Sequence, residues 1–168
     1  MLRDYQQRAI DQLYKWMSDG NKGHPCLVLP TGSGKSHIVA ALCKDAVQNW
    51  PETRILMLTH VKELIEQNAE KMRQHWPNAP MGIYSSSLRS KRLDEPITFA
   101  GIQSVRKKAA QIGHVDLIII DECHLVSHKE EGGYRMLIEA LTVFNPRLRV
   151  IGLTATPYRL GYGLIIDD

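Results

Sequence analysis

Apolar residues occur along the chain in two different spacings. Mostly apolar runs, which predict strands covered on both faces of a sheet, lie at residues 26–29, 55–58, 81–84, 97–100, 115–120 and 148–153. Apolar residues three and four positions apart predict helices over 5–17, 61–75, 102–110 and 133–144, and a further helix that ends near Trp50. Asp4 is positioned to cap the first helix, and residues 85–95 predict a loop or a short helix. Strands that alternate with helices predict an α/β three-layer domain with a mostly parallel central sheet.

A glycine-rich turn lies between the first predicted strand and the helix that follows it. Residues 30–36 read PTGSGKS, and strand, glycine loop and helix start in this order are typical of a phosphate-binding loop. The usual pattern has glycine at position 29, where this chain has Leu29, so the two glycines of the loop are expected to turn the backbone. The alternative is a glycine turn that begins an ordinary helix. The residues expected to bind nucleotide phosphates are Thr31, Gly32, Ser33, Gly34, Lys35 and Ser36.

Such a loop binds a polyphosphate through its backbone and through two side chains. Backbone N–H groups point inward, and the start of the helix adds unpaired amides and the positive end of its dipole. Lys35 is expected to reach the β- and γ-phosphates, and the Ser36 hydroxyl is expected to bind Mg²⁺.

Two acidic residues directly follow the predicted strand 115–120. Asp121 and Glu122 are therefore expected at the carboxyl edge of the sheet, where ligands bind in open α/β folds. Asp121 is placed there to hold Mg²⁺, and Glu122 to orient and deprotonate an attacking water. An acidic turn after a strand is weak evidence alone. Together with a phosphate-binding loop, it predicts a hydrolytic site with Lys35, Asp121 and Glu122 as catalytic residues.

The composition of the 168 residues is that of an ordinary globular domain, and their length suffices for one domain or one lobe of a larger protein. The net charge of +3 does not by itself indicate nucleic acid. Basic residues cluster at 89–92 and at 106–108. Such clusters fit either a nucleic-acid contact or solvated surface.

The cysteines and the start of the chain indicate the cellular compartment. Cys26, Cys43 and Cys123 are far apart and odd in number, which predicts reduced, buried thiols. His124 and His128 have the spacing of ligands on one helix face, but without the glutamate of an HExxH motif no metal site is expected there. The start of the chain is too polar for a signal peptide, and no apolar run approaches membrane-spanning length. A cytoplasmic protein is expected.

Three motifs resemble those of the first RecA-like lobe of superfamily 2 helicases. Residues 30–36 resemble motif I, residues 121–124 resemble motif II, and residues 154–156 resemble motif III. The resemblance covers essentially the whole chain and implies ATP and Mg²⁺ as cofactors. It implies a RecA-like lobe at residues 1–160 and the start of an interlobe connection at 161–168. A second RecA-like lobe is an expected partner, because no RxGRxxR segment that would supply arginine fingers is present.

The resemblance also implies roles for residues outside the phosphate site. Gln6 is expected to hydrogen-bond the adenine edge and Arg3 to lie against its ring, although Gln6 also fits a solvated helix position. Relatives often carry threonine where this chain has Gly101. The residues expected to contact a nucleic-acid strand are Thr59, His60, Lys62 and Gln103, of which the threonine is also a suitable cap for the next helix. The residues expected to couple phosphate state to the strand are His124, Thr154 and Thr156, of which the threonines also fit a turn before proline.

Residues 59–64, 103–105, 121–124 and 153–161 resemble the RadD-like group of bacterial DNA-repair proteins. This resemblance implies a DNA helicase or translocase in DNA repair, with DNA and single-strand-binding protein as partners. DECH in place of DEAD argues against the RNA-remodelling group. The alternatives are a double-stranded-DNA translocase of a restriction-type motor and a nucleotide-sensing module that does not hydrolyse, against which Glu122 argues. Without a second lobe, the chain is expected to hydrolyse ATP very slowly.

Overall fold

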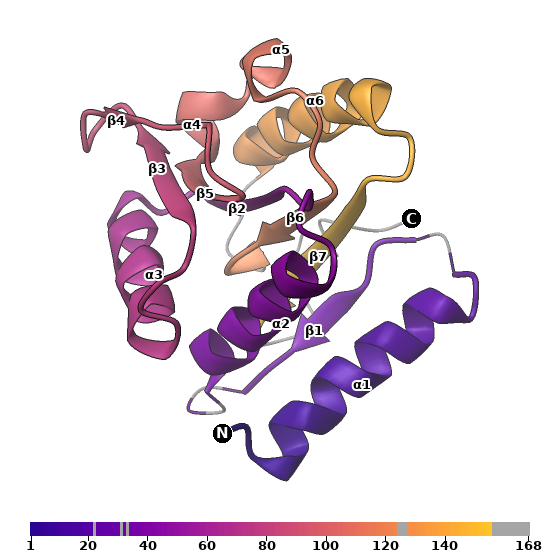
Figure 1. The fold of residues 1–168 in the computed structure, drawn as a ribbon. Helices are drawn as coiled ribbons and strands as arrows, with labels where there is room; N and C mark the ends of the chain where they lie inside the picture. Colours follow the sequence, from indigo (N-terminus) through magenta and orange to yellow (C-terminus); the bar gives the residue numbers. More distant parts are fainter. Residues whose placement is uncertain (22, 31, 33, 124–127, 156–168) are drawn as a thin grey trace.

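A computed structural model describes residues 1–21, 23–30, 32, 34–123 and 128–155 of the chain (Figure 1). The helices are α1 (Asp4–Ser18), α2 (Lys35–Asn49), α3 (Lys62–His75), α4 (Ile102–Val105), α5 (Ala109–Ile112) and α6 (His128–Phe144). The strands are β1 (Cys26–Val28), β2 (Ile55–Thr59), β3 (Met81–Ser85), β4 (Ser90–Lys91), β5 (Ile97–Gly101), β6 (Leu117–Ile120) and β7 (Arg149–Thr154).

The described strands form one sheet in the order β1-β7-β6-β2-β5-β3-β4. Neighbouring strands are parallel except β3 and β4, which pair antiparallel at one edge. Because parallel strands end at the same edge of a sheet, the segments that follow β1, β6 and β2 all emerge at one edge. The phosphate-binding loop, the acidic motif and the loop before α3 therefore share the carboxyl edge.

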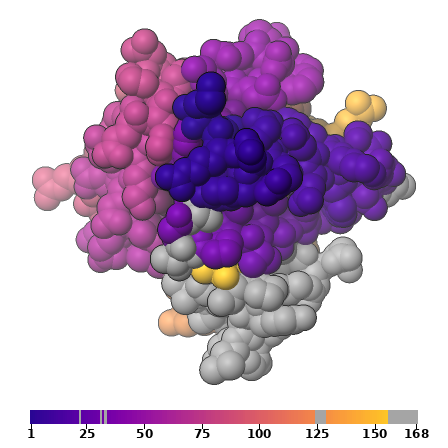
Figure 2. All heavy atoms as spheres, turned by 90° about the horizontal axis from the view of Figure 1, so that it is seen from below, coloured from indigo at the N-terminus to yellow at the C-terminus, as the bar shows by residue number. Residues whose placement is uncertain are grey.

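Helices cover both faces of the sheet (Figure 1). Side chains of α1, α2 and α3 join one apolar cluster with the strands, and those of α4, α5 and α6 join another on the opposite face. Viewed from below, α1 lies across the front of the molecule (Figure 2). Strands β2 and β5 are buried at every residue, as the predicted burial on both faces requires. Each fully buried isoleucine or leucine contributes roughly 1.5–3 kcal/mol to folding.

The predicted fold class is confirmed, but the predicted start of α1 is wrong. Arg3, not Asp4, occupies the N-cap position, and Asp4 is the first residue of the helix. The backbone N–H of Arg3 donates to Oε1 of Gln6 at 2.8 Å, so the side chain that closes this helix start comes from within the helix. The carboxylate of Asp4 still lies in the first turn, where the helix dipole favours negative charge.

Three further segments differ from their predictions. Residues 85–95 contain β4 instead of only a loop or a short helix, because Ser90 and Lys91 pair with the end of β3. The helix expected over 102–110 is divided into α4 and α5, with a turn in which the Lys108 N–H donates to the Val105 carbonyl. The last helix begins at His128, before the expected start at residue 133.

All three cysteines are free thiols. Cys43 and Cys123 are buried as predicted, but the prediction is wrong for Cys26, which is only partly buried. Burial raises the pKa of Cys43 to about 12, so its thiol stays protonated at neutral pH.

None of the described helices has the combination of length and apolar composition that spanning a bilayer requires.

Candidate nucleotide-binding site

The glycine loop after β1 brings the start of α2 close to α1. Gly34 precedes α2 with a φ of 78°, in the left-handed region that favours glycine. A Cβ atom at this position would lie 2.2 Å from Nε2 of Gln6. Gly32 also has a positive φ, of 82°. The two glycines therefore turn the backbone as predicted, and a side chain at Gly34 would also displace the amide of Gln6.

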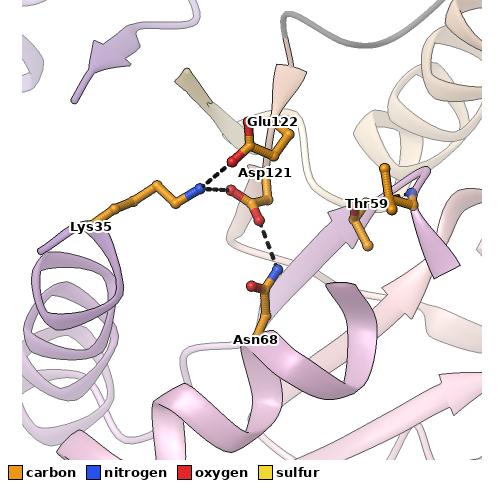
Figure 3. A network of polar contacts seen from close by, with 6 residues as sticks. Lys35, Thr59, Asn68, Asp121 and Glu122 are labelled. Carbon is orange, nitrogen blue, oxygen red and sulfur yellow. Dashed lines mark hydrogen bonds and ion pairs between the residues drawn. The ribbon is translucent and has the colours of Figure 1, made fainter. Parts of the chain in front are cut away.

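Lys35, the first residue of α2, forms the centre of a charged network at this edge of the sheet (Figure 3). Its Nζ lies 2.7 Å from Oδ1 of Asp121 and 2.7 Å from Oε1 of Glu122. Both carboxylates follow β6. They meet Lys35 although they lie 86 and 87 positions after it in the sequence. The structure thus brings together the three residues that the sequence predicts to be catalytic.

The ion pairs of Lys35 are partly shielded from water, unlike ion pairs on the surface. The side chain of Asp121 is only 4% exposed and that of Lys35 is 28% exposed. Desolvation by burial acts to lower the pKa of Lys35, but the charges and hydrogen bonds of Asp121 and then Glu122 outweigh it, and the pKa is raised. Lys35 therefore remains an ammonium group at neutral pH, which a phosphate-binding role requires.

Glu122 has a backbone conformation that is unusual for its residue type. Its φ is 51°, in the left-handed region, which costs a non-glycine residue roughly 1–2 kcal/mol. Strained backbone of this kind is found at functional sites when the surrounding structure maintains it. Here the strained residue directs its carboxylate to Lys35 (Figure 3).

A cavity of about 320 Å³ adjoins this network. Its polar lining consists of Lys35, Ser36, Asn68, Lys71, Asp121 and Glu122. A polyphosphate and Mg²⁺ fit this donor set, because it combines an ammonium group and helix-start amides with hard oxygen ligands. Ser36 and Asp121, the two predicted Mg²⁺ ligands, both line this cavity.

The residues predicted to contact adenine lie at the start of α1. Gln6 is 4% exposed, so it is a buried residue and not the solvated helix position that its alternative assumed. Its amide adjoins Gly34, which places it beside the phosphate-binding loop. Arg3 is exposed. Adenine contact by these two residues stays a prediction, and Thr31 and Ser33 lie outside the described residues.

The predicted nucleic-acid residues lie where β2 and β5 end and α3 and α4 begin. The ends of the two strands are adjacent, because Thr59 pairs with Gly101. Nε2 of Gln103 donates to the His60 carbonyl at 3.3 Å, and Lys62 is exposed at the start of α3. Thr59 is buried, and its hydroxyl accepts the Val61 N–H at 3.1 Å, so this threonine organises the turn into α3. Nucleic-acid contact by the four predicted residues stays a prediction.

A glycine at position 101 has a packing reason. A Cβ atom on Gly101 would lie 3.0 Å from Cδ1 of Ile65 on α3. A threonine there, as in the helicase motif, would require this side chain to move.

Of the three predicted coupling residues, only Thr154 is described. It is buried at the end of β7, and its carbonyl accepts the Leu29 N–H at 2.8 Å. This bond joins the end of β7 to the start of the phosphate-binding loop. His124 and Thr156 lie outside the described residues, and the coupling role stays a prediction.

Sequence reasoning missed one wall of the cavity, which α3 provides. Asn68, Lys71 and Met72 line the cavity, and Nε2 of His75 lies 3.3 Å from Oγ of Ser36. These four residues have the i, i+3, i+4, i+7 spacing of one helix face. The sequence indicates this helix only by apolar residues three and four positions apart, and no residue of it was assigned to the nucleotide site. The polar positions beside them were the available signal, but their orientation toward the phosphate-binding loop depends on the packing of α3 against α2.

The fold and this site define a P-loop nucleotide-binding domain of the RecA-like type. The chain belongs to the family described as type III restriction enzyme, res subunit, whose model matches residues 1–159.

The chain is also similar to known proteins in sequence and in fold. The protein IRC3 of Saccharomyces cerevisiae is 29% identical over 165 residues, which cover 93% of this chain and 23% of IRC3. The ATP-dependent DNA helicase MPH1 of Scheffersomyces stipitis is 26% identical over 167 residues, which cover 93% of this chain and 15% of MPH1. The chain therefore spans less than a quarter of the length of either relative. The crystal structure of the UvsW helicase from bacteriophage T4 shares the fold, with a TM-score of 0.68 at 22% identity over 92% of this chain and 52% of that chain.

Proposed function

We propose that this chain is the ATP-binding and ATP-hydrolysing lobe of a DNA helicase or translocase. The observation that carries the proposal is the contact of the Lys35 ammonium group with both Asp121 and Glu122 at 2.7 Å, beside a cavity that follows a glycine loop. An ammonium group between two carboxylates at the carboxyl edge of a parallel sheet is suited to exchange partners with a bound polyphosphate.

Each residue has a defined role in this proposal. Lys35 leaves the carboxylates for the β- and γ-phosphate oxygens, and the start of α2 contributes its amides. Asp121 and Ser36 would hold Mg²⁺, which would supply positive charge to neutralise the phosphates. Glu122 accepts a proton from the attacking water. Gln6 and Arg3 bind adenine.

Hydrolysis is favoured over nucleotide sensing because of Glu122. Its side chain is about one quarter exposed and lies at the cavity rather than in the core. A protein that only binds nucleotide has no requirement for a carboxylate that can activate water, still less for one on strained backbone.

DNA is the proposed substrate, and the loops after β2 and β5 are the proposed contact surface. His60, Lys62, Gln103 and the buried Thr59 that orders this turn would follow the phosphates of one strand. Support comes from the motifs that resemble the RadD-like group and from MPH1, which is named as a DNA helicase. A cytoplasmic DNA-repair setting, with single-strand-binding protein as a partner, follows from the RadD-like resemblance alone.

A second RecA-like lobe belongs to this proposal. Arginine fingers raise phosphoryl-transfer rates by about 10³–10⁵ in related systems, and the 168 residues contain no RxGRxxR segment. Lys35, Asp121 and Glu122 alone are therefore expected to support nucleotide binding and only slow hydrolysis.

The match to a restriction-enzyme family favours one alternative, a motor that moves along double-stranded DNA without separating its strands. Separation of a labelled forked duplex by a protein that carries both lobes distinguishes this alternative from a helicase.

The test of the proposed function is ATP hydrolysis measured in two proteins. The 168-residue chain should bind a fluorescent ADP analogue with Mg²⁺ and release phosphate slowly, with little response to DNA. A protein in which a second lobe follows the chain should hydrolyse ATP faster when single-stranded DNA is added. Nucleotide binding without hydrolysis in the two-lobed protein would overturn the proposal in favour of a sensor.

A further inference from the structure

The carboxylate of Asp121 has a second partner that is independent of Lys35. Nδ2 of Asn68, on α3, donates to Oδ2 of Asp121 at 2.7 Å, while Lys35 contacts Oδ1 (Figure 3). The backbone N–H of Asp121 donates to the Leu58 carbonyl at 2.9 Å. The main chain and both carboxylate oxygens are therefore held from three different elements.

We propose that Asn68 is a positioning residue that fixes the Asp121 carboxylate for Mg²⁺-nucleotide. This inference rests on the proposed function. Each carboxylate oxygen has two lone pairs, so an amide donor on Oδ2 leaves Oδ1 available for a metal ion or its water. Lys35 must exchange partners when phosphate binds, whereas Asn68 has no competing role in the site. Without Asn68, no side chain among the described residues would orient the Asp121 carboxylate once Lys35 has moved to the phosphates.

The helix that carries Asn68 is well placed for this role. Ile65, Ala69 and Met72 on the same helix are buried against the sheet and α2, which fixes the position of the Asn68 backbone. A neutral amide also holds the carboxylate without adding a charge that would repel Mg²⁺. Partners that orient metal ligands in this way typically change metal affinity by about 10–100-fold when removed.

The test measures how the affinity of the 168-residue chain for a fluorescent ADP analogue depends on Mg²⁺. Asn68→Leu has nearly the same size but no donor, and Asn68→Ser is a second variant that stays polar but is too short to reach Asp121. The matched control is Gln67→Leu, which removes the neighbouring exposed amide of the same helix. Asn68→Gln keeps the amide and tests rescue. Thermal melting temperatures are measured for all variants.

In both Asn68→Leu and Asn68→Ser, the Mg²⁺ concentration for half-maximal binding should rise about tenfold, with unchanged affinity in EDTA. Asn68→Gln should recover part of this loss, and Gln67→Leu should behave as wild type. A lower melting temperature with an unchanged Mg²⁺ response would show a merely structural role and overturn the inference, as would an equal shift in Gln67→Leu. A wild-type chain that binds no Mg²⁺-nucleotide would overturn the proposed function as well, so the two failures are distinguishable.

Discussion

Two regions of the same sheet edge differ in how completely they are assembled. Around β1 and β6, Lys35 contacts both Asp121 and Glu122 at 2.7 Å beside a cavity. Around β2 and β5, Lys62 and Gln103 are exposed, and the loops are joined by a 3.3 Å bond from Gln103 to a backbone carbonyl. The first region has its charges paired and at least partly buried, whereas the second presents the charge of Lys62 to solvent.

This difference teaches what each ligand requires. A nucleotide is small, so its site must be concave and pre-organised, and the cost of burying charge is offset by ion pairs within the protein. A nucleic-acid strand is long and is attracted by many exposed charges at modest energy each. Changes in the first region should therefore have large, specific effects, and changes in the second should have small effects that depend on salt.

The largest effect is expected for Glu122→Gln, which keeps the shape of the side chain and removes the proton acceptor. Loss of a general base typically lowers the rate by about 10²–10⁴-fold. ATP turnover by the two-lobed protein should fall by this amount, with nucleotide affinity nearly unchanged. Glu66→Gln, on the exposed part of α3, is the matched control. Normal turnover in Glu122→Gln would show that another group activates the water.

Lys35→Ala should cause the next largest effect, on nucleotide binding itself. Hydrogen bonds to charged groups contribute about 1.5–3 kcal/mol each, so loss of the ammonium group should weaken binding of fluorescent ADP about a hundredfold or more. The melting temperature should also fall, because the buried Asp121 loses its cation. Lys44→Ala, an exposed lysine on the same helix, serves as control. Unchanged affinity in Lys35→Ala would contradict the phosphate-binding loop.

Most of the fold could be predicted from the sequence because parallel strands and amphipathic helices leave clear patterns. The run Leu117–Ile120 is apolar throughout, and the structure places it as a central strand with its last three residues buried. The errors occur where short-range chemistry decides. Arg3 replaces Asp4 as the cap because Gln6 bonds back to it, and β4 exists only because β3 is available as a partner.

Site residues were predictable where they belong to a short sequence motif. Lys35 and Glu122 are identified by neighbours in sequence, and the sheet order then brings them together. Asn68 was not predictable, because its role depends on the rotation and packing of α3 against α2 rather than on adjacent residues. The sequence also left two roles open for Thr59, a nucleic-acid contact and a helix cap. In the structure, its hydroxyl accepts the Val61 N–H.

The smallest effect is expected for Lys62→Ala, and it tests the comparison most directly. Lys62 and Lys71 are on the same helix, but Lys62 begins α3 beside the exposed loops and Lys71 lines the nucleotide cavity. Lys62→Ala should weaken binding of a single-stranded oligonucleotide only a few-fold and reduce the slope of log affinity against log salt by about 0.7. Nucleotide affinity should not change.

Lys71→Ala should show the opposite behaviour, with weaker nucleotide binding and an unchanged salt slope for the oligonucleotide. Both affinities are measured by fluorescence anisotropy at several salt concentrations. If Lys62→Ala left the slope unchanged, the nucleic-acid strand would not pass the start of α3. If each variant weakened the binding of nucleotide and oligonucleotide equally, α3 would not contribute to two separate surfaces. The contrast between a buried nucleotide site and an exposed strand-binding surface would then be wrong.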